Sequence, residues 1–521
     1  MGLETSKRGL QTQQSALYTT GHNISNANTL GYSRQRVNME ATSGFPGVGL
    51  NAGTMPGFLG TGVTAGSIQR IRDGFVDQQF RGESNKLGYW ESRTNAISQM
   101  EDVLAEPSKY GLQQSLSDFW KSLQGLVTDP ENGGARAVVV ERGVAVADSF
   151  NYIHKSLTEI QTNLGKEIGF SASKINSVLS QIGELNRQIA EVEPNGYLPN
   201  DLYDARDVLL DELSTYVPIE VSYEKSGGRA LAIAEGSVTV KIKTNDKDNP
   251  FITVVQKGEA TNLTPLGKGD ATGNKTDSDG NPIGAITGFT FSGAPSGVTE
   301  LKVKDMQITG TLRSLVDSYG YESESPDKEG IRIIKGLYPE MIADLNKMAA
   351  AFADAFNGAH VGGTDAKGNP GGNFFDAKTP GKAFTAENIK VSDSLLKDSS
   401  KLAASDSTTV EVGNNNNAKK LADVLFKKLD TLEGSTVQSF FAGIIGELGV
   451  IGEKAVTMTK NSMTLLGAVS NRRDSISSVS LDEEMSDMIR FQQAYNASAR
   501  MITVVDETLD KIINGMGVVG R

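Results

Sequence analysis

Cysteine is absent from this sequence of 521 residues, and histidine and tryptophan are scarce, with three and two residues respectively. Without cysteine, disulfide bonds, thiol catalysis and cysteine-bound zinc are all excluded. The histidines His22, His154 and His360 lie far apart, and none has another histidine three or four residues away, as helical zinc sites require. The composition therefore gives no basis for a metal or another cofactor, and it suits a protein that travels unfolded into oxidising surroundings.

Long apolar runs and an excess of positive charge are also missing. No run of about 18 apolar residues occurs, which argues against a membrane-spanning helix. Residues 1–30 lack the cationic start and apolar block of a secretory signal peptide, so we expect either a cytosolic protein or export without a cleaved signal peptide. The net charge of −12 disfavours nucleic acid and anionic membranes as partners, so we expect no nucleic acid and no membrane insertion.

The chain is long enough for roughly three domains at about 100–200 residues each. Apolar residues recur at helical spacing in five internal segments, which are 86–104, 112–127, 135–193, 201–216 and 337–358. The segment 135–193 contains no proline and predicts a helical rod about 90 Å long. Alternating and β-branched residues in 217–335 predict antiparallel strands, and the polar segment 361–417 predicts β or irregular structure.

Both ends of the chain carry heptad repeats. The N-terminal seam consists of Leu3, Leu10, Leu17 and Ile24, separated mostly by polar residues. The C-terminal helix provides the second set of candidates, which are Leu481, Met485, Met488, Phe491, Tyr495, Ile502, Val505, Leu509 and Ile512. Neither end has enough neighbouring chain to cover it, so we expect the two terminal helices to pair with each other. Phe491, Met501 and Val504 lie off the main stripe, and packing against further copies would bury them; an ordinary intramolecular coiled-coil stalk is the alternative.

A break in the helical rhythm is expected near residue 480. The apolar four–three spacing of 444–479 ends there, and a new series begins two residues late. Ser480 and Glu483 have the spacing of a capping box, in which each side chain bonds the other residue's main chain. We therefore predict two helices that meet at a hinge, with a continuous helix and a register shift as the alternative.

The expected fold is multidomain and mainly α. It combines a terminal α-helical coiled coil, a long-helix bundle domain and an inserted antiparallel β domain. The expected divisions are 1–40 with 480–521 for the paired terminal helices, 41–216 with 336–360 and 418–479 for the long-helix bundle, and 217–335 with 361–417 for the outer β-rich domain.

Catalytic patterns are missing as well. No HExxH, GxSxG or phosphate-binding GxxxxGKS/T pattern occurs. Two loops, with Asp277, Asp279 and Asn281 in one and Asp365 and Asn369 in the other, resemble calcium loops but carry proline where an EF-hand needs glycine. We interpret both as turns between strands and expect no enzyme, with a site in the β region as a remote alternative.

Two terminal motifs resemble those of a known family. NISNANTLGYSRQ at 23–35 is similar to the N-terminal motif of flagellar axial proteins, in the form found in the hook-associated protein 1 family. LDEEMSDMIRFQQAYNASARMITVVDETLDKII at 481–513 is similar to the C-terminal motif of that family, and the middle segments LPEMIADLNKMAAAFADAFN and GGNFFD also resemble it. By this resemblance, the turn that leaves the inner tube is made by Asn23, Asn26, Asn28, Gly31 and Tyr32.

The resemblance implies an extracellular structural protein of the bacterial flagellum, located at the hook–filament junction and exported by the flagellar type III apparatus. It implies a ring of about eleven copies built through the terminal helices. The implied partners are the hook protein, a second hook–filament junction protein, and an export chaperone that binds the C-terminal helix. The alternative is another axial protein, either that second junction protein or flagellin, although the Tyr32-Ser33-Arg34-Gln35 form argues against both.

Overall fold

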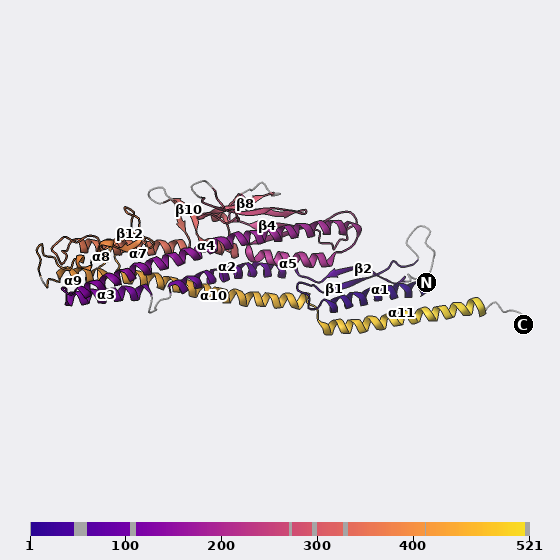
Figure 1. Ribbon diagram of the computed structural model, residues 1–521. Helices are drawn as coiled ribbons and strands as arrows, with labels where there is room; N and C mark the ends of the chain where they lie inside the picture. Colours follow the sequence, from indigo (N-terminus) through magenta and orange to yellow (C-terminus); the bar gives the residue numbers. More distant parts are fainter. Residues whose placement is uncertain are drawn as a thin grey trace.

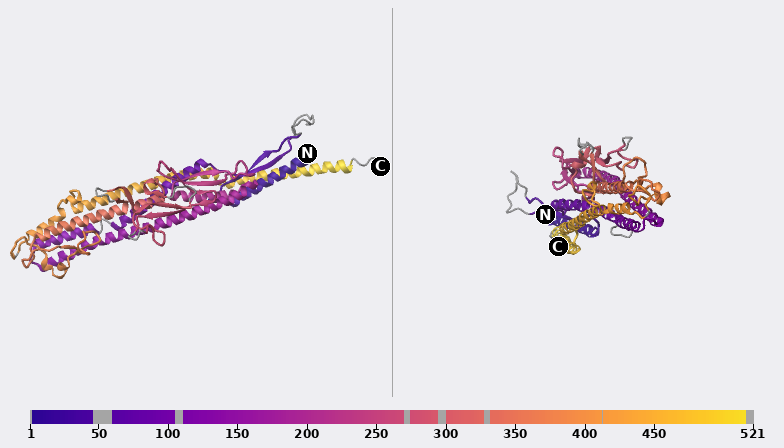
Figure 2. Two further views of the ribbon diagram at one scale, coloured as in Figure 1. Left: turned by 90° about the horizontal axis from the view of Figure 1, so that it is seen from above. Right: turned by 90° about the vertical axis from the view of Figure 1, so that its left-hand side faces the viewer.

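The computed structural model describes residues 2–45, 60–104, 111–269, 274–293, 300–326, 332–411 and 413–515. The molecule is long and narrow, with most helices aligned along its length (Figure 1). Helices α1 and α11 lie together at one end, and a small β-rich layer covers one side of the helical body (Figure 2). The mainly α, multidomain architecture is therefore confirmed.

Eleven α-helices are found in the described parts of the chain. Their bounds are α1 Gly2–Ser25, α2 Gly74–Leu104, α3 Leu112–Thr128, α4 Gly133–Val192, α5 Asn200–Tyr216, α6 Thr311–Tyr319, α7 Leu337–Val361, α8 Asp393–Lys397, α9 Asn416–Asp423, α10 Val437–Ser477 and α11 Leu481–Gly515. No helix among the described residues combines the length and apolar character needed to cross a membrane.

Helix α4 is the predicted rod. It runs unbroken for 60 residues, about 90 Å, and a stripe that includes Ile168, Ile175 and Ile182 is fully buried along it. Asn132 caps its start by accepting hydrogen bonds from the amides of Gly134 and Ala135. This one helix therefore connects the far end of the body with the part nearest the termini.

Within the described residues, the strands form four small sheets. Their bounds are β1 Gln35–Ala41, β2 Val63–Arg70, β3 Ile219–Glu224, β4 Ser237–Lys243, β5 Phe251–Gln256, β6 Glu259–Ala260, β7 Asn262–Gly267, β8 Ile286–Ser292, β9 Glu300–Lys302, β10 Tyr321–Pro326, β11 Arg332–Lys335, β12 Phe375–Ala377 and β13 Ile389–Val391. Pairing is antiparallel except between β8 and β10. β1 and β2 make a two-stranded ribbon from the Gly-rich region, of which 46–59 lies outside the described residues.

The expected union of 217–335 with 361–417 in one β-rich domain is not what the structure shows. β4 and β7 pack on the second half of α4, where Asn176 and Asn186 bond the main chain of these strands. β13, which pairs with β12, packs on its first half, where Asn151 donates to the carbonyl groups of Ala386 and Ile389. About 30 residues of α4, or about 45 Å, separate the two contacts, so the segments form separate units.

The far end of the body has an aromatic core. Phe374 and Phe375, from the sequence GGNFFD, are fully buried and pack against Phe119, Phe352 and Phe356 with ring centroids 4.8 to 6.5 Å apart. The segment 361–417 was expected to be β or irregular, yet α8 and the start of α9 lie within it. The buried residues of α9, Asn417, Ala418, Leu421 and Ala422, face this same part of the body.

Helix α10 lies along α2 and brings the end of the body back to its beginning. The two helices are antiparallel, since Thr94 bonds Thr459 and the guanidinium of Arg473 lies 3.7 Å from the ring centre of Phe80. Arg473 also donates to Asp211 at 2.6 Å. The start of α2 and the end of α10 are thereby held together. Both lead into the terminal unit, which consists of α1, α11 and the ribbon of β1 and β2.

Candidate assembly surface of the terminal helices

The two terminal helices pair with each other, as predicted, and the structure shows that they run antiparallel. The position of a Cβ on Gly2 lies 3.6 Å from Val505, and that of a Cβ on Gly9 lies 3.2 Å from the hydroxyl of Ser498. At the other end of the pair, Asn23 bonds Glu484. Each pair of residue numbers adds to 507, so the helices keep one register over the whole length of α1.

The buried face of α1 differs from the predicted leucine seam. Its buried residues are small or polar, namely Thr12, Ala16, Thr19, Thr20 and Asn23. Of the seam, Leu10, Leu17 and Ile24 are half-buried and Leu3 is exposed. The physical reason is that α1 contacts both α11 and the ribbon, and small side chains allow both to approach; Thr12, for example, bonds the Val63 carbonyl of β2.

Helix α11 has one face toward α1 and one toward solvent. Among the predicted seam residues, Met488, Phe491, Tyr495, Ile502 and Val505 are half-buried along the pair, whereas Leu481, Met485, Leu509 and Ile512 are exposed. The expectation that Phe491 lies off the main stripe is wrong, because it faces Ala16 and Thr20 across a small groove. Ile489, Met501 and Val504 are exposed on this helix, so apolar area stays uncovered in the single chain.

We call NISNANTLGYSRQ, residues 23–35, the exit motif, and Asn23 is at the centre of its hydrogen bonds. Its amide group donates to the Gln35 carbonyl at 2.9 Å and to the Glu484 carboxylate at 3.0 Å. Its carbonyl oxygen accepts from the Tyr32 hydroxyl at 2.8 Å and from the Gln35 amide at 3.0 Å. With only 1% of its surface exposed, Asn23 joins α1, the start of the ribbon and α11.

Burial shifts the pKa values of two partners of Asn23, the Tyr32 phenol and the Glu484 carboxyl. Burial raises the pKa of the Tyr32 phenol, and the carboxylates of Asp201 and Asp204 raise it further, so this group stays protonated and can donate. Burial likewise raises the pKa of Glu484, although the hydrogen bond from Asn23 opposes that shift. The cluster is therefore polar, buried and fully engaged.

The other motif residues have unequal roles. Asn26 donates from its side chain to the His22 carbonyl and accepts from Thr29, which forms the turn after α1. Gly31 has φ = +80°, and a Cβ there would lie 2.1 Å from a methyl carbon of Val208. Asn28 is exposed. The structure thus brings Asn23, Asn26, Gly31 and Tyr32 into one turn and leaves Asn28 at its surface.

The helix break near 480 is found, but the predicted capping box is not. α10 ends at Ser477 and α11 begins at Leu481. Within the described part of the chain the Ser480 hydroxyl makes no hydrogen bond, and the Glu483 carboxylate accepts from Arg34 at 2.5 Å instead. Arg34 also donates from its main chain to the Ser477 carbonyl at 2.8 Å. Glu483 is therefore drawn to Arg34 of the exit motif, and the break is linked to that motif.

A buried ion network was missed by the sequence analysis. At the base of the ribbon, Arg70 bonds Asp204 at 2.7 Å and Asp207 at 2.9 Å, and Arg72 bonds Asp207 at 2.9 Å. Arg81 of α2 also reaches Asp207, at 3.2 Å. Burial by itself raises the pKa of Asp207, but the surrounding arginines outweigh burial and lower the pKa to about 2.

This network joins the terminal unit to the body. Ser33 of the exit motif belongs to it, because its amide and hydroxyl both donate to Asp204, at 3.1 and 2.7 Å. One signal was present in the sequence: Asp204, Asp207 and Asp211 recur at three- and four-residue spacing on a single predicted helix. Such a carboxylate stripe on a helix that also packs against the body indicates buried cationic partners.

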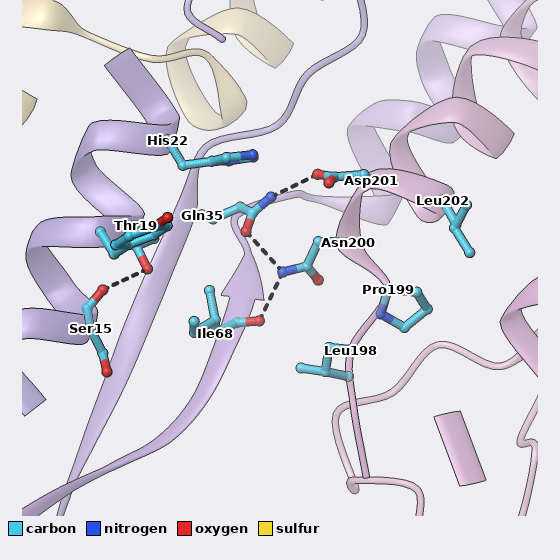
Figure 3. A pocket seen from close by; sticks show the side chains of 11 residues that line it. Ser15, Thr19, His22, Gln35, Ile68, Leu198, Pro199, Asn200, Asp201 and Leu202 are labelled. Atoms are coloured by element: carbon cyan, nitrogen blue, oxygen red, sulfur yellow. Dashed lines mark hydrogen bonds between the residues drawn. The ribbon is translucent and has the colours of Figure 1, made fainter. Parts of the chain in front are cut away.

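A groove of about 610 Å³ lies between α1 and the segment 198–202 (Figure 3). Gln35 crosses it, donating to Asp201 at 3.3 Å and accepting from Asn200 at 3.1 Å, while Asn200 also donates to the Ile68 carbonyl. On this side, α1 is connected to the body through the ribbon. The polar groups of the groove are amides, hydroxyls, one carboxylate and His22, whose Nδ1 lies 2.9 Å from the Tyr32 hydroxyl.

The two loops that resemble calcium sites are Asx turns. The first lies between strands β7 and β8, as interpreted, whereas the second lies between helix α7 and strand β12. Asp277 accepts from the amides of residues 279 and 281, and Asp365 accepts from those of residues 367 and 369. Asn281 and Asn369 each donate a side-chain bond to the same aspartate. Each carboxylate thus accepts hydrogen bonds from its own loop. No group of three or more metal-binding side chains is found in the described ranges.

Three family descriptions match parts of the chain. "Flagellar hook-associated protein FlgK helical domain" matches residues 97–375, which is more than half of the sequence. "Flagellar basal body rod FlgEFG protein C-terminal" matches 473–515, and "Flagella basal body rod protein" matches 3–32. The last two matches cover α11 and α1, so the terminal pair is the part that resembles basal body rod proteins.

Complete relatives and a solved structure agree with these matches. The chain is 44% identical to flagellar hook-associated protein 1 of Bacillus subtilis, over 100% of this chain and 99% of that protein. It is 28% identical to the protein of that name from Salmonella typhimurium, over 89% of this chain and 74% of that one. The flagellar hook junction protein FlgK from Burkholderia pseudomallei shares the fold, with a TM-score of 0.59 and 13% identity over 77% of this chain and 100% of that one. The chain therefore belongs to the flagellar hook-associated protein 1 family and is an axial component of the flagellum.

Proposed function

We propose that this protein polymerises axially through α1 and α11 and forms the junction ring between hook and filament. The observation that carries the proposal is the outer face of α11, where Met485, Ile489, Met501 and Val504 are exposed while the opposite face packs on α1. Burying a half-exposed side chain of this size contributes roughly 1 kcal/mol. Four such side chains per copy supply a substantial driving force for lateral packing of the helix pairs.

The proposed partners follow from the position of the ring between two polymers, the hook and the filament. The ring contacts the hook protein on one side and a second hook–filament junction protein on the other, with about eleven copies around the axis. Before assembly the same apolar face of α11 is a docking site for an export chaperone. The protein leaves the cell through the flagellar export apparatus without a cleaved signal peptide and works outside the cell.

The break between α10 and α11 gives the junction a hinge. The connection of the terminal unit to the body includes the exit turn, the base of the ribbon and residues 478–480. The ribbon base is held by buried ion pairs, whereas the last connection is a short non-helical segment linked to the exit turn by Arg34. We propose that bending of the hook is accommodated at 478–480 while the packing of the terminal helices is kept.

A catalytic role is not part of the proposal. The relatives are structural proteins of the flagellum. The groove between α2 and β3, of about 310 Å³, is lined by Asp77 and Arg81, together with Lys86, Glu220 and Lys243, which are in ion pairs of their own. Asp77 is paired with Arg72 and Arg81 with Asp211, so both are engaged in the ion network.

The test is the binding of purified full-length protein to isolated hooks, followed by electron microscopy of the hook ends. We expect a short ring at the hook tip and no long filament; long self-assembled filaments would contradict the junction role and indicate a flagellin-like protein. Met501→Lys should abolish the ring. Ile308→Lys, a matched change at an exposed apolar residue of the body, should leave the ring intact. Equal ring formation by both variants would refute assembly through α11.

A further inference from the structure

Helix α10 has an outer face that nothing covers in the single chain. Its inner face packs on α2 through buried residues such as Leu448 and Ala455. Val456 and Met463, seven residues apart and therefore on one face, are more than half exposed. Lys460 lies between them and is exposed. A coiled-coil-like stripe thus faces outward from the body.

Two glycines mark the ends of this stripe. Gly449 precedes Val456 by seven residues, and Gly467 follows Lys460 by seven. The position of a Cβ at either glycine has no atom of the chain within 4 Å, so both open to free space. The two glycines are 18 positions apart, which corresponds to five helical turns, or about 27 Å. The stripe therefore has Val456, Lys460 and Met463 in its middle and an uncovered glycine at each end, about 27 Å apart.

Helix α4 carries a complementary set of exposed side chains. Tyr152 and Phe170 are 67% and 70% exposed, which is unusual for aromatic residues on a body helix. They are also 18 residues apart, so they share one face at the same spacing of about 27 Å. Glu159 lies between them and is exposed, with only a long 3.8 Å contact to Lys155. The aromatic spacing on α4 equals the glycine spacing on α10.

The helices α4 and α10 run in the same direction along the body. α2 separates α4 from α10 in Figure 1. α10 is antiparallel to α2, α2 is parallel to α5 through the Arg81–Asp211 and Ser84–Thr215 contacts, and α5 is antiparallel to α4. Copies placed side by side in one orientation therefore present α10 of one to α4 of the next.

We propose that α10 of each copy packs along α4 of the adjacent copy, with Phe170 over Gly467 and Tyr152 over Gly449. This register places Lys460 about 6 Å along the helix axis from Glu159, within reach of the long lysine side chain. A glycine allows an aromatic ring to reach the helix backbone, as a knob enters a hole. Because the two surfaces differ, the contact is head-to-tail, and such contacts form rings or helices. The inference rests on the proposed junction ring and names its second subunit contact, outside the terminal helices.

Charge reversal tests the contact. Lys460→Glu and Glu159→Lys are expected to lower the apparent affinity of the protein for isolated hooks by roughly fivefold each, as for one partly shielded ion pair. The double variant should restore most of the loss, because the pair is re-formed with opposite signs. Wild-type affinity in both single variants, or a double variant as weak as the worse single one, would overturn the proposal.

Cysteine cross-linking tests the register directly, since the chain has no cysteine of its own. Full-length Phe170→Cys/Gly467→Cys should form disulfide-linked multimers on hook tips and stay monomeric in dilute solution. In the matched control Phe170→Cys/Asn461→Cys, the second cysteine is turned about 120° around α10 and should not link copies. Absence of multimers on hook tips that carry visible rings, or links to the hook protein instead, would refute this contact and leave the junction ring standing. Absence of rings from wild-type protein would refute the proposed function itself.

Discussion

Replacing Asn23 by alanine should open the terminal helix pair, whereas the same change at Asn28 should not. Both residues belong to the Asn-rich exit motif and look equivalent in the sequence. In the structure Asn23 is buried and Asn28 is exposed. The comparison of Asn23→Ala with Asn28→Ala therefore separates a buried hydrogen-bonding role from the general effect of shortening an asparagine in this segment.

The magnitude follows from the four hydrogen bonds of Asn23. Three join neutral partners, the two main-chain groups of Gln35 and the Tyr32 hydroxyl, and one reaches the Glu484 carboxylate. At roughly 1 kcal/mol for each neutral bond and roughly 2 kcal/mol for the charged one, the upper limit is about 5 kcal/mol. Water that enters the vacated site recovers part of this, so we expect about 3 kcal/mol, or an increase of roughly 150-fold in the open population.

Hydrogen exchange measured by mass spectrometry on the full-length protein provides the assay. Peptides from α1 and the first half of α11 should exchange on the order of 100-fold faster in Asn23→Ala, because exchange reports local opening. Peptides from α4 should be unchanged, and Asn28→Ala should match the wild-type protein throughout. Equal exchange of α1 in the two variants would show that the Asn23 cluster does not hold the pair together.

Three further predictions concern the register, the exit turn and the ion network. Gly9→Cys/Ser498→Cys should form an intramolecular disulfide, since the Cβ positions are 3.9 Å apart, and a pair with the second cysteine moved by one residue should not. Gly31→Ala should cost about 2–3 kcal/mol in unfolding free energy, from the positive φ and the clash with Val208; an unchanged melting temperature would contradict this. Asp207 ionises with a pKa of about 2 when folded and about 3.9 when unfolded, so its stabilisation of about 2 kcal/mol is present above pH 4 and lost as the pH falls from about 4 to 2. The stability difference from Asp207→Asn should shrink across that window in acid denaturation, and a constant difference would count against the network.

Helical periodicity predicted the long elements well. The rod of α4, the end of α10 near 480 and the pairing of the chain ends all follow from apolar spacing and from the absence of proline. These features depend on local sequence and on the need to cover an amphipathic face, both of which can be evaluated without coordinates.

The buried face of α1 could not be found in the same way. Periodicity selects large apolar residues such as Leu10 and Leu17, but α1 must fit between a helix and a ribbon, and Ala16 and Thr12 serve that purpose better. Which neighbour a helix meets depends on the whole fold. The same holds for the capping box: Glu483 has the right spacing, yet Arg34, brought close only by folding, takes its carboxylate.

The contacts of the exit motif were beyond prediction for a related reason. Asn23 and Glu484 are 461 residues apart, and nothing in the local sequence of either identifies the other. The ion network likewise joins Arg70 to Asp207 across 137 residues. Resemblance to a family located the motif, whereas the physical role of each residue required the structure.

The contact of Arg473 with Phe80 and Asp211 implies an order of folding. Joining the chain ends directly would close a loop of about 460 residues, whereas once Phe80 and Arg473 are in contact only about 70 residues stay free between Asn23 and Glu484. That difference is worth about 2 kcal/mol of chain entropy in favour of late closure. The terminal helices should therefore pair last, after the body has formed, so a subunit that joins the proposed ring would fold its body before α1 and α11 come together.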